Sequence, residues 1–183
     1  MMARSRSVGV VGGIFLVAAA CLGGPAPEPE QKSATPLMVG NEEGKVVPVA
    51  AGEWEKLPHR KVEVKEKDGT ATRYEGVTLA EVLRFGGVPF DGHLRGPRVA
   101  NYVLVEAADG YRAVFALAEI DPSMTDKVVL VADRQDGKPL PESAGPYRLV
   151  VPDDKIHSRW VRQVTRITVQ TPAVSKDGGA PKK

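Results

Sequence analysis

The sequence contains one cysteine, Cys21, in 183 residues, so no disulfide can form within the chain. It also lacks an apolar run of the ~20 residues that a membrane-spanning helix needs. The uncharged run of apolar and small residues from 8 to 20 is too short for that purpose. These two absences exclude a disulfide scaffold and a helical membrane protein that crosses the bilayer through this run.

An excess of one charge is absent as well. The chain has 25 basic and 23 acidic residues. The first 20 residues contain Arg4 and Arg6 and no acidic residue, so the remainder has 23 of each sign. Nucleic-acid binding proteins carry basic patches that neutralise phosphates. The balanced charge therefore predicts no nucleic-acid partner.

Motifs of several common active sites are also missing. Ser143 and Ser158 lack the G-x-S-x-G surroundings of a nucleophilic serine, and the chain has no glycine-rich phosphate loop. His59, His93 and His157 are far apart and show no metal-ligand spacing. We therefore expect no metal site built on these histidines.

The N-terminus has the three parts of a secretory signal. Arg4 and Arg6 precede the apolar run, and the small residues Ala18-Ala19-Ala20 end it. Glycines interrupt the run and a proline-rich stretch follows, which argues against a buried core helix. The pattern predicts a signal peptide over residues 1–20 and a location in the periplasm or cell envelope.

Cys21 lies directly after the predicted cleavage site, and two interpretations remain open. A general signal peptidase would cut after Ala20 by the A-x-A pattern. Alternatively, Ala18-Ala19-Ala20-Cys21 resembles a bacterial lipobox, in which the thiol of Cys21 is acylated, although Ala18 replaces the usual leucine. A lone exposed thiol is a liability, which favours lipidation. Such a lipid would be the chain's only contact with a membrane.

The composition divides the rest of the chain into three regions. Residues 21–36 are rich in Pro, Ala and Glu and predict a disordered linker. Residues 171–183 predict a disordered tail. Residues 37–170 form a single domain, large enough to bury about two thirds of its unfolded surface.

Within this domain, short strands dominate the pattern. Val62 and Val64 alternate with charged residues, and a turn at Asp68-Gly69 leads to residues 72–74 as a hairpin. Residues 102–107 and 111–115 predict a second hairpin around Asp109-Gly110. Further strands are predicted at 128–132 before a turn at Asp136-Gly137, at 147–151, and around Ile167 and Val169.

The helices are expected to be few and short. Thr78 and Glu81 have capping-box spacing, the apolar positions Leu79, Val82 and Leu83 share one face, and Gly86-Gly87 ends the segment. Single turns are predicted at residues 117–120 and 160–164, and Trp54 and Trp160 are expected to pack in or at the core. Together, the predicted strands and helices indicate an α+β domain with a mixed, mostly hairpin-linked sheet and short helices.

Several stretches, in this order, resemble the molybdopterin-binding domain of sulfite oxidase-type oxidoreductases. They are Tyr74-Glu75-Gly76-Val77-Thr78-Leu79, Gly86-Gly87-Val88-Pro89, Ala108-Asp109-Gly110-Tyr111, Asp136-Gly137-Lys138-Pro139-Leu140-Pro141, Gly145-Pro146-Tyr147-Arg148-Leu149-Val150-Val151-Pro152 and Arg159-Trp160-Val161. The resemblance runs from about Leu37 to Val169 and implies a sulfite oxidase molybdopterin-domain-like fold.

The resemblance fails at one chemical position. Enzymes of this family hold molybdenum through two pterin sulfurs and a protein cysteine, a soft ligand that other side chains do not easily replace. The stretch between the first hairpin and the second strand pair, where this ligand is expected, has no cysteine, and Cys21 lies in the signal region. Whether the chain is an enzyme therefore stays open. We expect it to bind no cofactor. If it does bind one, the resemblance implies molybdopterin.

Three basic residues are the candidates for cofactor or anion binding. Arg148 matches the arginine of the family's G-x-P-x-R stretch near the cofactor, while His157 and Arg159 lie in a loop beyond the following strand. The competing interpretation is that Arg148 is paired internally and that the loop residues are only solvated.

Two classes of function remain. The first is a non-catalytic binding or partner module, whose partner is a protein or a small anionic ligand. The second is an oxidoreductase component that binds molybdopterin without a cysteine ligand. The missing cysteine favours the first, because fold alone does not determine function.

Overall fold

A computed structural model describes residues 36–65, 69–90, 92 and 94–173. Its elements in chain order are β1 (Leu37–Gly40), β2 (Val46–Val49), α1 (Ala51–Trp54), β3 (His59–Lys65), β4 (Ala71–Thr78), α2 (Leu79–Phe85), η1 (Gly96–Ala100), β5 (Tyr102–Ala107), β6 (Arg112–Ala116), η2 (Leu117–Glu119), β7 (Leu130–Gln135), β8 (Lys138–Pro139), β9 (Arg148–Val150), η3 (His157–Arg159) and β10 (Val164–Gln170). The predicted signal peptide with Cys21, the linker up to residue 35 and the tail from residue 174 lie outside the described residues.

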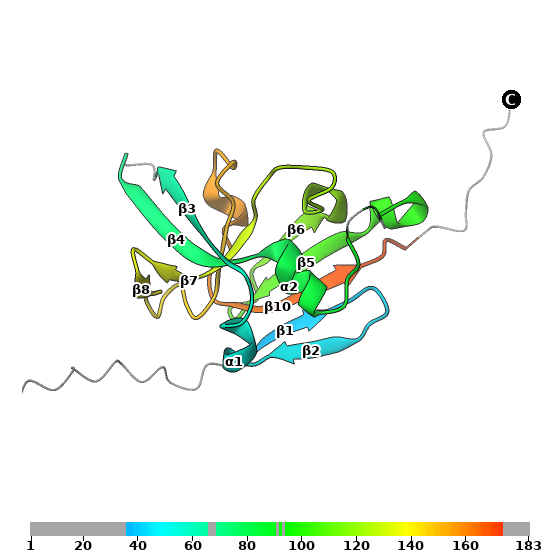
Figure 1. The fold of residues 1–183 in the computed structure, drawn as a ribbon, viewed down its shortest axis with the longest axis horizontal. Coiled ribbons are helices and arrows are strands. Elements are labelled where there is room, and N and C mark those ends of the chain that lie inside the picture. Colours follow the sequence, from blue (N-terminus) through cyan, green and yellow to red (C-terminus); the bar gives the residue numbers. More distant parts are fainter. Residues whose placement is uncertain (1–35, 66–68, 91, 93, 174–183) are drawn as a thin grey trace, which may run out of the picture. The chain divides into compact units, whose positions relative to one another are not determined.

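The strands form two sheets (Figure 1). The first sheet has the order β2-β1-β10-β5-β6, and the second has the order β3-β4-β7-β8, with β9 also paired to β7. Sequential strands pair as antiparallel hairpins, whereas β1 and β10 pair in parallel with Met38 opposite Arg166. The α+β class with a mixed, mostly hairpin-linked sheet is confirmed.

Local sequence explains two special positions in the second sheet. Asp136 and Gly137 have φ values of 51° and 77°, as the tight turn between β7 and β8 requires. At Gly76 in β4, a Cβ atom would lie 2.1 Å from the carbonyl oxygen of Val131. The strand pairing shifts by one residue at this point, so the bulge depends on the missing side chain.

A continuous apolar core joins the two sheets. Val39, Val105 and Ile167 contribute from the first sheet, and Val77 and Leu149 from the second, each with no exposed surface. Trp54 and Trp160 are 3% and 5% exposed, which confirms their predicted packing in the core.

Helix α2 follows the predicted signals. The Oγ1 of Thr78 accepts a hydrogen bond from the backbone N–H of Glu81 at 3.4 Å. Leu79, Ala80, Val82 and Leu83 are buried, and Gly87, with φ of 89°, ends the segment in the left-handed conformation that glycine favours.

The prediction of a helical turn at residues 160–164 was wrong. The single turn is η3, and the chain then runs beside β9, because the N–H of Leu149 donates to the carbonyl of Val161. Strand β7 also begins later than predicted and extends to Gln135. Val129, which was predicted to lie in this strand, precedes it, and its carbonyl accepts a hydrogen bond from the N–H of Leu79 at the start of α2.

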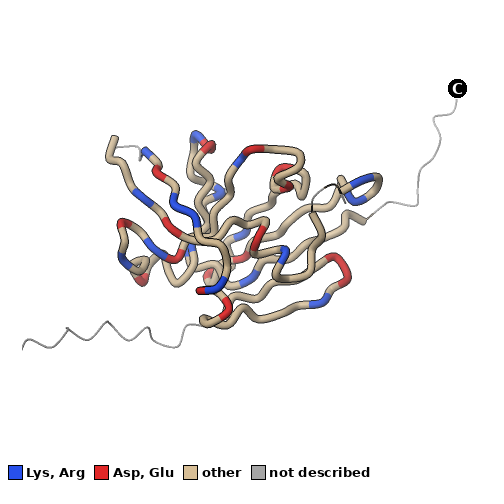
Figure 2. Tube along the Cα trace, in the orientation of Figure 1, with Lys and Arg blue, Asp and Glu red and all other residues tan. Residues whose placement is uncertain are grey.

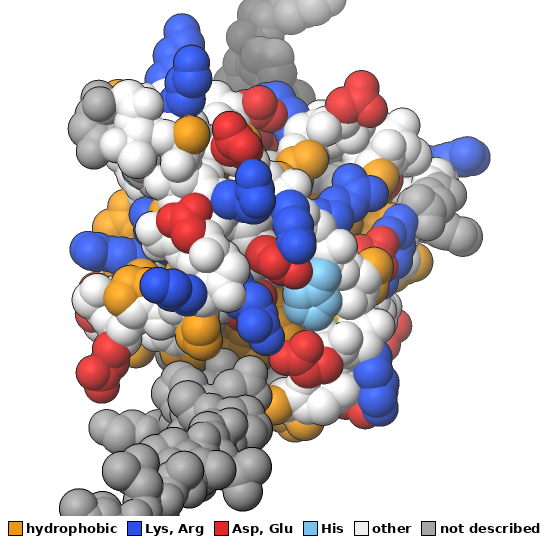
Figure 3. Space-filling view, turned by 60° about the vertical axis from the view of Figure 1, so that its left-hand side comes forward, with side chains coloured by type: hydrophobic (Ala, Val, Ile, Leu, Met, Phe, Trp, Pro, Cys, Tyr) orange, Lys and Arg blue, Asp and Glu red, His pale blue; other side chains and the backbone are white. Residues whose placement is uncertain are grey.

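The surface carries both charges without segregation. Lys and Arg alternate with Asp and Glu along the chain (Figure 2), and the face in Figure 3 shows the two kinds of side chain interspersed. Among the described residues, no helix is long and apolar enough to cross a membrane.

Candidate functional site

Arg148 begins β9 and packs between two aromatic rings. Its guanidinium carbon lies 5.2 Å from the ring centre of Tyr74 and 5.4 Å from that of Trp160. Its Nη1 donates a hydrogen bond of 2.9 Å to the hydroxyl of Tyr74. Its Nε is buried and has no hydrogen-bond partner among the described residues. Arg148 is therefore held by aromatic contacts, and its Nε–H is a buried donor that these contacts leave unused.

Trp160 is the centre of this group. Its indole N–H donates to the carbonyl of Val151 at 3.0 Å, which fixes the ring at the end of β9. Tyr74 meets it edge-on, with ring centres 6.0 Å apart. His157 stacks on it at 3.7 Å with an interplanar angle of 12°. We call Tyr74, Arg148, His157 and Trp160 the Trp160 cluster.

Arg159 lies in the same loop as His157, but its guanidinium is paired with carboxylates. It makes a forked pair with Asp154, at 2.9 and 2.7 Å, and also donates to Glu119 at 3.1 Å. Its guanidinium covers the ring of buried Phe115 at 4.5 Å. The hydrogen bond with Asp154 raises the pKa of Arg159, so this side chain stays charged and is occupied within the fold.

The structure thus brings together two of the three predicted site residues. Arg148 and His157 both contact Trp160, while Arg159 is paired with two carboxylates away from them. Sequence reasoning did not include Tyr74 or Trp160 in the site. The only available signal was that both occur in the stretches that carry the family resemblance.

A second polar group lies around the other tryptophan and was not predicted. Trp54 meets His59 edge-on at 5.9 Å and Tyr147 at 4.7 Å. Its indole N–H faces the carboxylate of Asp133, but neither Trp54 Nε1 nor Asp133 Oδ1 completes a well-formed hydrogen bond with described residues. We call Trp54, His59, Asp133 and Tyr147 the Trp54 cluster.

Burial dominates the electrostatics of the Trp54 cluster. It raises the pKa of Asp133, against the opposing effects of Trp54, His59 and Arg134. Burial, with the nearby charge of Asp133, also raises the pKa of Tyr147 to about 12. The Trp54 cluster therefore holds a carboxylate that the fold stabilises poorly in its charged form.

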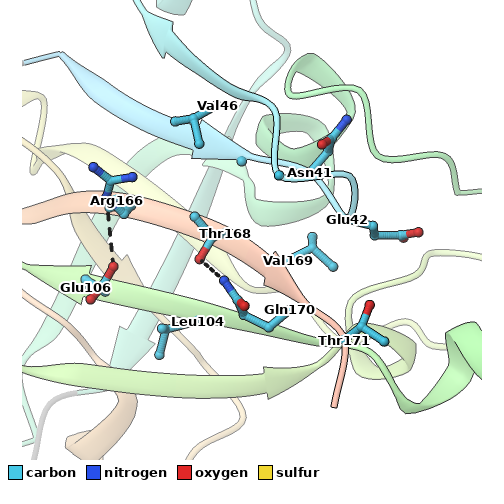
Figure 4. A pocket seen from close by; sticks show the side chains of 12 residues that line it. Asn41, Glu42, Val46, Leu104, Glu106, Arg166, Thr168, Val169, Gln170 and Thr171 are labelled. Atoms are coloured by element: carbon cyan, nitrogen blue, oxygen red, sulfur yellow. Dashed lines mark hydrogen bonds and ion pairs between the residues drawn. The ribbon is translucent and has the colours of Figure 1, made fainter. Parts of the chain in front are cut away.

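A hollow in the first sheet contains no residue of either cluster. It is about 480 Å³ in volume and is lined by residues of the first sheet, among them Val46, Leu104 and Thr168 (Figure 4). Its charged groups are engaged: Arg166 lies 3.9 Å from Glu106, and Glu42 accepts from Arg98. None of the three predicted site residues lines this hollow.

The fold and the Trp160 cluster define a two-sheet α+β domain with an arginine held on an aromatic surface. A family model described as the oxidoreductase molybdopterin binding domain matches residues 41–176, so the chain belongs to that family. The crystal structure of the sulfane dehydrogenase SoxCD from Paracoccus pantotrophus is similar in fold. Its TM-score is 0.57 at 21% identity, over 76% of this chain and 39% of the dehydrogenase chain. Comparison with curated proteins gives no significant match.

The residues of the matched segment do not fit a cysteine-ligated molybdenum. Residues 41–176 contain no cysteine, so the thiolate donor that the resemblance implies is missing. Among the described residues, no group of three or more His, Cys, Asp or Glu side chains is placed to hold a metal ion. His93 lies outside the described residues.

Proposed function

We propose that this chain is an exported, non-catalytic binding module with the fold of the molybdopterin oxidoreductases. The observation that carries the proposal is the absence of any cysteine from the matched segment, residues 41–176. Without the soft thiolate ligand, the domain keeps the family's core but lacks its metal chemistry. The basic start and apolar run before residue 21 support export.

The internal pairing of the predicted site residues supports the same proposal. Arg159 is bound by two carboxylates, and the guanidinium of Arg148 is packed on Tyr74 and Trp160. Charged side chains held in this way contribute to the fold, and redirecting either of them would break these contacts. The module's partner is then a protein, or a small anion that needs only the buried Nε–H of Arg148.

A second candidate function rests on that donor. Arg148 Nε is buried without a partner, and a buried N–H left unsatisfied is costly. An anion reaching it would gain a strong hydrogen bond. This favours an oxidoreductase component that binds molybdopterin without a cysteine ligand, through its phosphate or pterin.

Metal analysis of the exported chain separates the two functions. The chain should be purified from cells that make molybdopterin, without chelators, and its molybdenum measured by mass spectrometry. The proposal expects no stoichiometric molybdenum. About one molybdenum per chain would overturn it and establish the second candidate. A variant with Arg148→Ala, measured in parallel, would then show whether this arginine retains the cofactor.

Processing is tested on the same material. Intact-mass measurement should find a chain that begins at Cys21, with the added mass of acyl groups if the thiol is lipidated. The substitution Cys21→Ser is the matched control, because it removes lipidation while leaving Ala18-Ala19-Ala20 for the general peptidase. A chain that still begins at Met1 in the membrane fraction would contradict export with cleavage.

A further inference from the structure

Strand β6 is an outer strand of the first sheet and pairs there with β5 (Figure 1). Before β6, the N–H of Ala107 donates to the carbonyl of Tyr111. After it, the N–H of Leu117 donates to the carbonyl of Asn101. Bonded and non-bonded pairs alternate along an antiparallel ladder, so every second residue of β6 turns its backbone away from β5. These residues are Arg112, Val114 and Ala116.

Little of the described structure occupies this open edge. The N–H of Ala116 donates to Oε1 of Glu119 at 3.0 Å. In the described part of the chain, the outward backbone groups of Arg112 and Val114 have no hydrogen-bond partner. The 3-10 turn η3 lies near β6, but its contacts are with the side chains of Tyr111 and Phe115. Those side chains alternate with the outward residues, so η3 covers the inner face of β6 and leaves the edge open.

The other outer strands carry features that discourage pairing with another chain. Strand β2 contains Pro48, and β8 has only two residues, one of them Pro139. The edge of β9 is covered, because the N–H of Leu149 donates to the carbonyl of Val161. Strand β3 has charged side chains at four of its seven positions. Strand β6 has no proline, and its one charged residue is the first. It is therefore the outer strand that is open to pairing.

We propose that β6 pairs antiparallel with β6 of a second copy of this chain, across a two-fold axis at Val114. This pairing joins the two five-stranded sheets into one and goes beyond the proposed binding module. Each Val114 then exchanges both backbone hydrogen bonds with its symmetry mate, and each Arg112 N–H donates to the carbonyl of Ala116 in the other copy. The side chain of Val114 is 51% exposed, and β-branched pairs across strands are stabilising.

The row of residues that leads across the sheet to Val114 supports this register. The pairings of the five strands place its members side by side (Figure 4): Val46, Gly40, Thr168, Leu104 and Val114. A two-fold axis at Val114 continues the same row into the second copy, so the side chains that meet across the new strand pair are again apolar.

The charges beside the edge are complementary between two copies. Arg112 of one copy lies opposite Ala116 of the other, beside Glu119. In the described residues, the guanidinium of Arg112 uses only Nε, toward Glu106 at 2.9 Å, and Glu119 accepts from Ala116 and Arg159 at Oε1. On pairing, the N–H of Ala116 exchanges Glu119 for the carbonyl of Arg112, and the carboxylate of Glu119 meets the guanidinium of that residue. The two-fold symmetry makes this contact twice.

The mass of the chain in solution tests the pairing. One strand pair buries less than a standard interface, so we expect weak association, with a dissociation constant above about 10 µM. The exported chain with Cys21→Ser should be used, because it excludes association through a lipid or a disulfide. Between about 1 µM and about 1 mM, its mass by sedimentation equilibrium should rise toward two copies and stop there, because a two-fold pair is closed. A chain that stays monomeric, or that grows beyond two copies, would overturn the proposal.

Substitutions locate the contact. Val114→Pro removes the outward N–H without breaking a bond to β5, so it should abolish association. If this variant does not fold, Val114→Lys should do the same by placing two positive charges opposite each other. Arg112→Glu, which faces Glu119 of the other copy, should weaken association about tenfold. Val46→Lys, at the far end of the same row, is the control and should leave association unchanged.

Two results of this series would contradict pairing through β6. One is association that survives both changes at Val114. The other is association that is lost when the chain is cut after residue 173, because the segment 174–183 would then hold the copies together. That segment contains Gly178-Gly179 and Pro181, which disfavour a strand, so the shortened chain should associate as the longer one does.

A disulfide tests the register. Val114→Cys, added to Cys21→Ser, gives the chain a single thiol at the two-fold axis. The Cα atoms of a bonded antiparallel pair lie about 5.5 Å apart, which a disulfide can span. Under oxidised glutathione this variant should form a covalent dimer much faster than a chain with Val46→Cys. Equal rates for the two variants, or no covalent dimer with Val114→Cys, would show that the strands do not meet at Val114.

Discussion

The Trp160 and Trp54 clusters are built from the same kinds of side chain but satisfy their polar atoms differently. Each has a buried indole, a histidine ring against it and a tyrosine. In the Trp160 cluster the indole N–H is bonded to Val151 and the charged member is a cation lying on aromatic faces. In the Trp54 cluster the indole N–H makes no well-formed hydrogen bond within the described part of the chain, and the charged member is an anion.

Two consecutive residues supply these two clusters. Tyr147 packs on Trp54, and Arg148 packs on Trp160. Aromatic faces carry negative potential, so they stabilise a guanidinium and not a carboxylate. The rings of Tyr74 and Trp160 therefore suit the guanidinium of Arg148, whereas burial raises the pKa of Asp133 against the opposing effect of Trp54. The charged member of the Trp160 cluster is thus stabilised by its surroundings, whereas burial disfavours the charged form of Asp133 in the Trp54 cluster.

Removing the two indoles should have the largest effects. Trp54→Ala and Trp160→Ala should each cost about 3–5 kcal/mol of unfolding free energy, because both rings fill the core. The two clusters are distinguished by Trp→Phe. Trp160→Phe also removes the indole donor from the carbonyl of Val151, which keeps only the N–H of Asp154, so it should cost about 1 kcal/mol more than Trp54→Phe. Denaturant unfolding measures each free energy. Equal costs for the two Phe variants would contradict the inference that the indole N–H is hydrogen-bonded in the Trp160 cluster and not in the Trp54 cluster.

Arg148→Ala tests whether the Trp160 cluster is structural. It removes the hydrogen bond to Tyr74 and the contacts with two rings, so it should cost roughly 1–3 kcal/mol. Arg112→Ala is the matched control, since its side chain is 65% exposed and should cost under about 0.5 kcal/mol. A small cost for Arg148→Ala, together with phosphate raising the melting temperature of the native chain but not of the variant, would instead indicate an anion site.

Thr78, which lies outside both clusters, provides a reference for these changes in unfolding free energy. Thr78→Ala removes the side-chain cap of α2 and should cost about 1 kcal/mol, while Thr78→Ser, which keeps the hydroxyl, should recover most of it. The midpoint of chemical denaturation measures both. If Thr78→Ala leaves the midpoint unchanged, the 3.4 Å contact to the Glu81 amide contributes nothing and α2 is held by its buried face alone.

The elements that could be predicted are those with local signals. Turn residues such as Asp136-Gly137 identified the hairpins, and Thr78 with Gly86-Gly87 delimited α2. The parallel pairing of β1 with β10 could not be predicted in this way, because it joins the two ends of the domain and depends on the whole core. Likewise, the turn expected at residues 160–164 gave way to tertiary contacts of Trp160 and Val161.

The site was predictable only in part for a related reason. Arg148 was selected from the family resemblance and His157 from its place in a basic loop beside a strand end, and their shared contact is Trp160, which was expected only to pack. Arg159 was selected with them, but it forms an ion pair with the nearby Asp154. The Trp54 cluster draws on α1, β3, β7 and the chain before β9. No spacing in the sequence connects these segments, so only the fold could reveal the group.

The smallest expected effect, the pH dependence of Asp133→Asn, tests the comparison most directly. Because the folded state raises the pKa of Asp133 above its unfolded value, the native chain is relatively most stable below the unfolded value of about 3.9. It loses that contribution as the pH rises through the folded pKa. Asp133→Asn does not titrate, so it should melt higher than the native chain at pH 7, and the difference should shrink as the pH approaches 4. Asp154→Asn is the control, at a carboxylate that makes a well-formed ion pair. It breaks the forked pair with Arg159, so it should lower the melting temperature at pH 7. If Asp133→Asn also lowers it at pH 7, then Arg134 and Trp54 satisfy the carboxylate after all, and the two clusters do not differ in the way described.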